Sequence, residues 1–165
     1  MAPTPTFHPR SLAAARSELA VATRQAATAV STLLGGAIIA VPDPAHVIPR
    51  PPDVMAPTDA QAVITMVWGT SGAPDPEWWR TPLGAACAAS LVESASGAMS
   101  PTTAAVMLGL ARTTVSTMLR RSVQEPRAYR DTLPRLEPGE DARVVTTASV
   151  LRRLVATHPI VDDVG

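Results

Sequence analysis

Apolar residues recur at helical spacing along several stretches of the chain, and clusters of Pro and Gly separate these stretches. The first stretch runs from Ser11 to about Leu34, is rich in alanine and contains neither Pro nor Gly. It predicts a long helix that ends at Gly35 and Gly36, because glycine is the residue that most readily terminates a helix. The apolar residues 37–41 that follow predict either a short strand or continued apolar packing.

A Pro-rich segment, residues 42–57, predicts a linker with little regular structure, because proline lacks a backbone N–H and restricts its neighbours. Thr58 and Gln61 then have the spacing of a capping box, in which each side chain bonds the backbone N–H of the other residue. We therefore expect a helix over residues 59–68. Its mostly apolar composition predicts that it is buried in the core or against a partner.

A second break, residues 69–77, contains Gly, Pro and polar residues and predicts a domain boundary. It divides the chain into an N-terminal helical region, residues 1–75, and a second domain, residues 76–165. Trp78 and Trp79 follow the break directly. We expect this pair to cap the next helix or to seal the core, and the alternative is an aromatic contact with a partner.

Two consecutive helices of the second domain have the same start signal, a hydroxyl residue followed by proline. Thr81 precedes a predicted helix over residues 82–96, and Ser100 precedes a predicted helix over residues 101–108. A hydroxyl group caps the first free N–H groups of a helix, and proline at the first helical position loses no hydrogen bond. A third helix is predicted over residues 111–121, after a turn that contains glycine.

The stretch from Ser100 to Arg121 has the residue pattern of two short helices that pack across a tight turn. Ala105 lies where the helices come closest, and Gly109 lies at the turn, where a left-handed backbone is needed. The remaining pattern positions are apolar and expected to be buried: Leu108, Leu110, Val115 and Met118. The stretch resembles the helix-turn-helix of DNA-binding proteins, and the resemblance implies that the second helix enters the DNA major groove.

After the three helices, the chain changes to a β pattern. Residues 127–130 and 143–147 predict two short strands on either side of a loop with Pro and acidic residues. A last helix is predicted over residues 148–156, with Arg152 and Arg153 on its exposed side. A second helix followed by a hairpin resembles the winged domains of excisionase and MerR-like regulators. The expected fold class is therefore mainly α, with a three-helix helix-turn-helix core, a small β-hairpin wing and an N-terminal helical region.

Charge narrows the place where a nucleic acid would bind. The 165-residue chain has a net charge of zero, contains no lysine and has 14 arginines, so a nucleic-acid signal must be local. Between Arg112 and Arg130 there are five arginines and one acidic residue, Glu125. The positive excess therefore falls on the segment that the helix-turn-helix pattern selects.

The exposed side of the third helix and the first strand of the wing supply the predicted DNA contacts. Arg112 has a planar fork of donors that matches guanine, so it is the first candidate for a base contact. Small hydroxyl side chains near it suit bases or phosphates, whereas arginines at the helix end and on the wing suit phosphates or a minor groove. The predicted contact residues are Arg112, Thr113, Thr114, Ser116, Thr117, Arg120, Arg121, Arg127 and Arg130.

The other reactive residues form no catalytic or metal-binding pattern. His8, His46 and His158 are isolated, and none has an acidic partner at metal-ligand spacing. Cys87, the single cysteine, has alanine-rich surroundings that predict a buried small hydrophobic residue. We therefore expect no enzyme activity, no cofactor and no bound metal.

The sequence also lacks the signals of export or membrane insertion. The first ten residues contain no apolar run behind a basic end. The uncharged, largely apolar stretch of residues 26–41 is shorter than the roughly 20 apolar residues that a membrane-spanning helix needs. We therefore expect a cytoplasmic protein without a membrane segment.

Together these patterns predict a sequence-specific DNA-binding protein, a transcriptional regulator or repressor, whose partner is double-stranded DNA. The alanine-rich, lysine-free composition suggests a GC-rich genome and hence a phage, plasmid or actinobacterial source. The alternative is a helical protein-interaction module, such as an antitoxin or an assembly adaptor, that uses the same helices as a scaffold. The apolar N-terminal helices leave two outcomes open, a homodimer or packing on the second domain.

Overall fold

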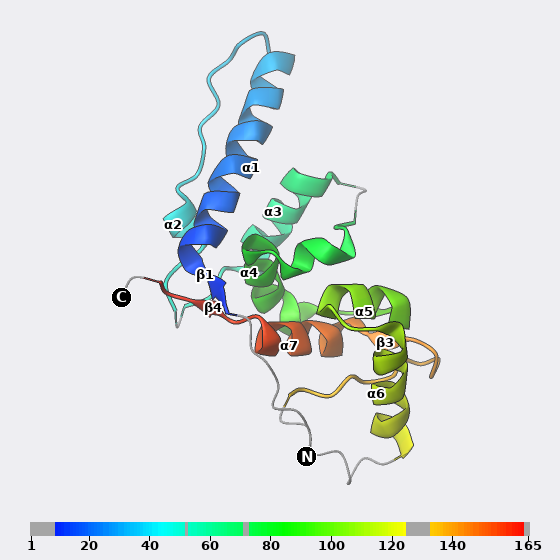
Figure 1. Cartoon of the computed structure of the whole chain (residues 1–165). Coiled ribbons are helices and arrows are strands. Elements are labelled where there is room, and N and C mark those ends of the chain that lie inside the picture. The colour runs from blue at the N-terminus through cyan, green and yellow to red at the C-terminus, as the bar shows by residue number, and fades with distance from the viewer. Residues whose placement is uncertain (1–8, 52, 71–72, 125–132, 164–165) are drawn as a thin grey trace.

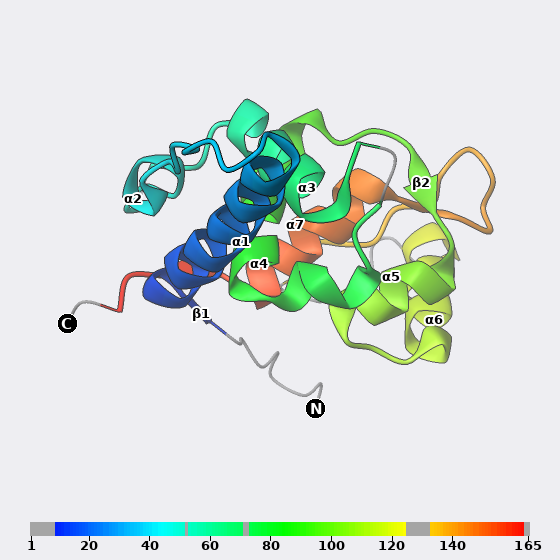
Figure 2. The same ribbon diagram turned by 90° about the horizontal axis from the view of Figure 1, so that it is seen from above.

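The computed structural model describes residues 9–51, 53–70, 73–124 and 133–163 of the chain. Most of its elements are helices, so the predicted mainly α fold class is confirmed (Figure 1). In chain order, the elements are β1 (Arg10–Ser11), α1 (Leu12–Leu33), α2 (Pro44–Val47), α3 (Pro57–Trp68), the 3₁₀ helix η1 (Pro76–Arg80), α4 (Pro82–Leu91), the 3₁₀ helix η2 (Val92–Ser94), β2 (Ala98–Met99), α5 (Pro101–Leu108), α6 (Arg112–Gln124), β3 (Val145–Thr146), α7 (Thr147–Thr157) and β4 (Ile160–Val161). Two views at right angles show that α1 and α6 lie at opposite ends of the molecule (Figure 1 and Figure 2).

Helix α4 occupies the centre of the fold, where it packs against α1, α3, α7 and η1. Its residues from Leu83 to Ala88 are all buried, and those after Leu83 are all small. Gly84 is required by this packing, because a Cβ atom at this position would lie 2.1 Å from the Trp78 carbonyl oxygen. Small side chains therefore allow several neighbouring elements to approach α4 closely.

The first turn of α4 is capped from two directions. As predicted, the Thr81 hydroxyl accepts a hydrogen bond from the Gly84 N–H, at 3.1 Å. A carboxylate oxygen of Glu18 in α1 also accepts the Leu83 N–H, at 2.8 Å. A negative charge at the positive end of the helix dipole stabilises the start of a helix. Glu18 thus joins the N-terminal helix to the centre of the fold by charge as well as by packing.

The buried apolar residues form two clusters that meet at α4. The first cluster joins α1, α3 and η1 to the start of α4, and the second joins α5, α6 and α7 to the rest of α4. Trp78 lies in the first cluster and meets the rings of Trp68 and Trp79 edge to face, at centroid distances of 6.1 and 5.3 Å. The tryptophan pair therefore seals the core. Packing across the first cluster joins residues on both sides of the boundary predicted between positions 75 and 76.

The two ends of the described chain lie side by side and fix the base of α1. β1 and β4 pair in parallel, with Arg10 opposite Ile160. The carboxylate of Asp163 accepts the Ser11 hydroxyl at 2.5 Å and the Ala13 N–H at 3.0 Å. These hydrogen bonds, with that from Ser11 the stronger cause, lower the pKa of the Asp163 carboxyl below its usual value.

Two local predictions in the N-terminal half are wrong. Residues 37–41 form no strand, and Ile38 among them is 99% exposed. Thr58 does not cap the next helix, because α3 already starts at Pro57, with Ala56 in the capping position and no side-chain cap. The fixed backbone angle of proline suits the first helical position, so the helix starts before the predicted capping box.

Two predictions in the second half also need correction. Helix α4 ends at Leu91 instead of Ser96, and the 3₁₀ helix η2 follows it. Arg153 is buried and not exposed, and its guanidinium donates to the Pro134 carbonyl oxygen at 3.1 Å. The spacing of residues within α7 cannot show this burial, because the segment that covers Arg153 lies 19 residues earlier in the chain.

Candidate nucleic-acid interface

Helices α5 and α6 pack across the tight turn that the sequence predicts. The Ser100 hydroxyl accepts the Thr103 N–H at 3.2 Å and caps α5, and Gly109 ends this helix with a left-handed φ of 66°. The Leu110 N–H donates to the Ala105 carbonyl oxygen at 2.9 Å, so the chain reverses directly beside Ala105. Ala105 is buried, as expected at the point of closest approach.

The turn contacts Arg80, a residue that no sequence pattern indicates. A Cβ atom at Gly109 would lie 3.1 Å from Nη1 of Arg80, so glycine leaves the space that this side chain occupies. The Arg80 carbonyl oxygen accepts the Nε–H of Arg10 at 2.7 Å, and η1 packs along α5. Arg80 therefore connects the turn between α5 and α6 to the start of the described chain.

One side of α6 is apolar and faces the second core cluster. Val115 and Leu119 are buried, while Leu110 and Met118 are partly buried at the edge of the cluster. The predicted buried set omits Leu119, although it lies four residues after Val115 and therefore on the same side of the helix. The spacing of these residues leaves the other side of α6 toward solvent.

The solvent side of α6 is polar and carries most of the predicted contact residues. Thr117 is only half-exposed, and its hydroxyl donates to the Thr113 carbonyl oxygen at 2.8 Å. This hydroxyl proton is therefore already hydrogen-bonded within the helix. Arg127 and Arg130 lie outside the described residues. The predicted residues that are exposed are Arg112, Thr113, Thr114, Ser116, Arg120 and Arg121.

This solvent side is positively charged at both ends. Helix α6 contains three arginines, Arg112, Arg120 and Arg121, and no acidic residue. None of the three forms an ion pair with an acid in the described ranges. The start of α6 adds free backbone N–H groups and the positive end of the helix dipole beside Arg112. The face therefore offers many donors and no competing carboxylate from its own helix.

A small sheet lies next to the start of α5. β2 and β3 are antiparallel, with Met99 opposite Val145, and Pro138 forms a further antiparallel bridge to Val145. The predicted strand over residues 143–147 is thus shorter than expected, and it pairs with a segment that no pattern had selected. The other predicted strand, residues 127–130, lies outside the described residues.

The loop from Gly139 to Val144 carries charges of both signs. Glu140, Asp141 and Arg143 are all exposed. The Arg143 backbone N–H donates to the Asp141 carboxylate at 3.0 Å. Two acids against one arginine make this loop less favourable for a phosphate than the arginines of α6 are.

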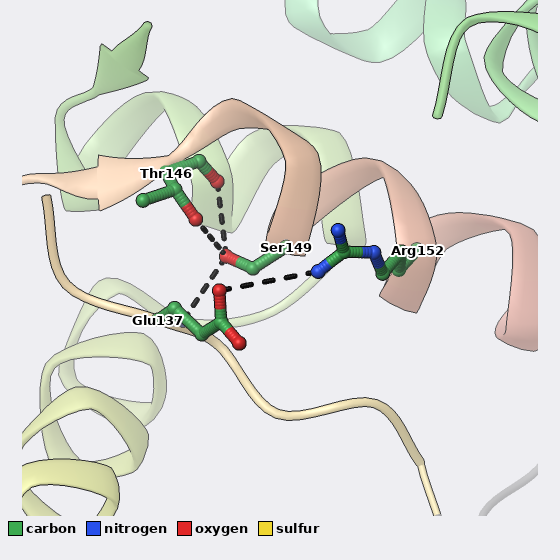
Figure 3. A network of polar contacts seen from close by, with 4 residues as sticks. All are labelled: Glu137, Thr146, Ser149 and Arg152. Carbon is green, nitrogen blue, oxygen red and sulfur yellow. Dashed lines mark hydrogen bonds and ion pairs between the residues drawn. The ribbon is translucent and has the colours of Figure 1, made fainter. Parts of the chain in front are cut away.

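Ser149 of α7 anchors the base of this loop, as Figure 3 shows. Its buried hydroxyl accepts the Glu137 N–H at 3.0 Å and the Thr146 hydroxyl at 2.9 Å, and it donates to the Thr146 carbonyl oxygen at 2.9 Å. Arg152 lies 3.9 Å from the Glu137 carboxylate. The small sheet is therefore fixed to α7 through Ser149, a residue that the sequence does not single out.

The cysteine and the described histidines lie in separate surroundings. Cys87 is fully buried, and this burial, with the charge of Glu18, raises its pKa to about 12. His46 is exposed and lies 3.9 Å from Asp43, whereas His158 is buried. No group of three or more His, Cys, Asp or Glu residues able to hold a metal occurs in the described ranges.

Comparison of the chain with models of protein families, with curated proteins and with solved structures gave no match. In the part of the chain that the structure describes, no helix is both long enough and apolar enough to cross a membrane. The functional interpretation of the α6 face therefore rests on its geometry and charge.

Proposed function

We propose that this chain is a sequence-specific DNA-binding protein, a transcriptional regulator of the repressor type, with a winged helix-turn-helix that contains α4, α5 and α6. One observation carries the proposal: the solvent side of α6 combines three arginines with small hydroxyl residues, directly after a left-handed glycine turn. An α-helix fits the major groove of B-DNA, and small side chains allow it to approach the base edges there.

The elements around α6 support the same proposal. Helix α5 packs against α6, α7 and η1, and the sheet of β2 and β3 lies beside this group. The sheet is connected to the helices at both strands, since β2 leads into α5 and β3 leads into α7. Such support suits a DNA-reading helix, because base contacts require side chains that are held in a fixed geometry.

We assign different roles to the two ends of α6. Arg112 lies in the first turn, next to Thr113 and close to Ser116, and its fork of donors matches the O6 and N7 atoms of guanine. Arg120 and Arg121 lie about two turns later and are assigned to phosphates, which position the helix without reading sequence. The acidic loop 139–144 is assigned no direct phosphate contact.

Selection of bound duplexes from a random pool, followed by fluorescence anisotropy with a selected duplex, tests these roles. Arg112→Ala is expected to cost about 1–3 kcal/mol of binding free energy and to relax the preference at one base position. Arg120→Ala is expected to weaken binding to all duplexes and to reduce the salt slope by about one. Arg50→Ala is the matched control, because Arg50 is also exposed but lies outside α6, in the segment that follows α2, and it should leave binding unchanged.

Salt dependence decides whether the proposal holds. Phosphate contacts release counterions, so the affinity for a duplex must fall as the salt concentration rises. Duplex binding that is absent, or that does not depend on salt, would contradict the proposal. Equal losses for Arg112→Ala and Arg50→Ala would also contradict it, because a loss at Arg50 cannot come from the α6 face.

The far half of α1 favours a second candidate, a helical protein-interaction module such as an antitoxin or an assembly adaptor. Leu33 at its end and Ile38 in the segment that follows are exposed, and exposed apolar patches mark protein contacts. In this function α5 and α6 serve only as scaffold. The salt experiment separates the candidates, because an interaction module of this kind shows no salt-sensitive binding to duplex DNA.

A further inference from the structure

The far half of α1 and the segment that follows it form an arm, residues 24–41, that extends beyond the other helices (Figure 1). The buried residues of α1 all precede the arm: Leu12, Ala15, Leu19 and Thr23. Within the arm, the exposed fraction is 84% for Leu33, 62% for Leu34 and 99% for Ile38. The arm thus exposes large apolar side chains that water disfavours.

One face of α1 carries a continuous stripe that is apolar apart from one threonine. Its members follow one another at intervals of three or four residues: Leu12, Ala15, Leu19, Thr23, Ala26, Val30 and Leu33. The first half of this stripe is buried where α1 packs against α3 and α4. In the arm the same stripe is exposed at Val30 and Leu33. The helix therefore presents a core-type face that its own described chain covers only in part.

The arm is uncharged beyond Arg24. Residues 25–42 contain no Asp, Glu, Lys, Arg or His. The hydroxyls of Thr28 and Thr32 donate to the carbonyl oxygens of Arg24 and Thr28, each at 2.9 Å. These hydroxyl protons are therefore bonded within the helix, and the arm offers no charge that would attract a charged partner.

These properties fit a second copy of the same chain. A two-fold contact requires a surface that is complementary to itself, and an uncharged apolar stripe meets this condition without repulsion. Two arms that cross near Val30 place small residues, Ala26 and Ala29, close to the crossing, where helix axes approach to about 8–10 Å. The arm has 18 residues, fewer than the roughly 20–30 that each partner contributes to an interface of standard size, so a dimer formed by the arm should dissociate on dilution.

We propose that the arm is a dimer interface, in which two copies of the chain pack arm against arm about a two-fold axis. Helix α6 lies at the other end of each copy, so this pairing leaves both α6 faces uncovered (Figure 2). Dimer formation does not depend on DNA binding. The dimer would present two α6 faces to two DNA half-sites, and this role rests on the proposed function.

Sedimentation equilibrium of the full chain, from low to high micromolar concentration, tests the interface. The wild-type chain is expected to show a dimer mass that falls toward the monomer mass on dilution. Leu33→Glu is expected to remain a monomer, because the dimer would bury a carboxylate of each copy. Val54→Glu is the matched control and should remain a dimer, because Val54 is an exposed apolar residue, 67% accessible, outside the arm.

Three results would overturn the proposal. The first is a wild-type chain that is monomeric at every concentration. If this monomer also binds phosphatidylcholine vesicles in a flotation assay, the arm contacts lipid instead of a second copy. The second is a Leu33→Glu chain that stays dimeric, and the third is a Val54→Glu chain that dissociates to the same extent. Far-UV circular dichroism of each variant shows whether its helices are intact.

Disulfide cross-linking provides a test that disturbs the arm less. Cys87 is buried, so a cysteine introduced at the surface is the accessible thiol of the described chain. On oxidation, Val30→Cys is expected to form a covalent dimer rapidly, and Val54→Cys is expected to react at least tenfold more slowly. Equal rates for the two variants would overturn the proposed interface even if Leu33→Glu failed to fold.

The dimer and the DNA-binding function fail in different ways. Leu33→Glu should bind a duplex with one half-site as the wild type does, and should lose only the added affinity for a duplex with two half-sites. Arg112→Ala should weaken DNA binding and keep the dimer mass. If the wild-type chain dimerises through the arm but binds no duplex, the proposed interface stands and the proposed DNA-binding function is wrong.

Discussion

Helix α6 and the arm of α1 each turn one side toward solvent, but the two sides have opposite chemistry. The solvent side of α6 has three arginines and several hydroxyl groups, and its apolar residues Val115 and Leu119 are buried. The arm has no charge beyond Arg24, and its apolar residues Val30 and Leu33 are exposed. The core of the protein thus covers the apolar side of α6, whereas part of the apolar side of α1 stays exposed.

The difference teaches that exposure alone does not identify a partner. A cationic face is well hydrated and needs no cover in the free protein, but it attracts a polyanion over long range. An uncharged apolar face has no such attraction and gains free energy only when another apolar surface covers it. The two faces therefore suit different proposed partners, DNA for α6 and a second copy for the arm.

The largest expected effect comes from shortening the same type of residue on each helix. Leu119→Ala removes a buried side chain from below α6 and should lower the free energy of unfolding by about 2–5 kcal/mol. Leu33→Ala shortens a side chain that is 84% exposed. In a dilute, monomeric sample it should change the free energy of unfolding by less than about 0.5 kcal/mol. Urea denaturation followed by circular dichroism measures both, and similar losses would remove the contrast.

The next effect concerns the small sheet beside the helix pair. Ser149→Ala removes the acceptor of the Glu137 N–H, and the unpaired group should lower the free energy of unfolding by about 1–3 kcal/mol. Ser17→Ala is the control, since Ser17 is exposed on α1 and should change stability by less than about 0.5 kcal/mol. Thermal denaturation compares the two variants, and an unchanged Ser149→Ala protein would show that the network adds no stability.

Two glycines separate backbone strain from the Arg80 contact. Gly109 and Gly35 have left-handed φ values of 66° and 70°, so alanine at either should cost about 1–2 kcal/mol of stability. Only at Gly109 would the new Cβ press on Arg80, at 3.1 Å, because no atom lies within 4 Å of such a Cβ at Gly35. Denaturation should therefore show the larger loss for Gly109→Ala, and equal losses would mean that the end of the Arg80 side chain moves aside without cost.

The smallest effect is expected at the base of α1. Hydrogen bonds to Asp163 fix this end of the helix, whereas the arm at its other end is exposed. Hydrogen bonds from Ser11 and Ala13 lower the pKa of Asp163 below its ordinary 3.8, so they stabilise the folded chain more when the carboxyl is ionised. This contribution is present above the ordinary pKa and is lost as the pH falls through the lowered one. Asp163→Asn should therefore reduce stability slightly at neutral pH and flatten its acid dependence, as thermal unfolding across the acid range would show. An unchanged acid dependence would contradict this role.

The sequence by itself determined the helix pair and the turn between its members, because the signals involved are local. Ser100 and Gly109 each act on backbone groups within a few residues, so no distant segment is needed for their effect. The spacing of Val115 and Met118 likewise indicated which side of α6 faces solvent, and therefore that Arg112 is exposed.

Only the tertiary structure decided the contacts between distant segments. The partner of β3, the position of Arg80 at the turn and the burial of Arg153 all depend on segments that no local pattern connects. The same limit explains the arm. Leu19 and Leu33 lie on one stripe of one helix, yet only Leu19 is buried, because α3 and α4 pack against α1 there and leave Leu33 exposed. Residue spacing shows which side of a helix is apolar, but packing decides what covers it.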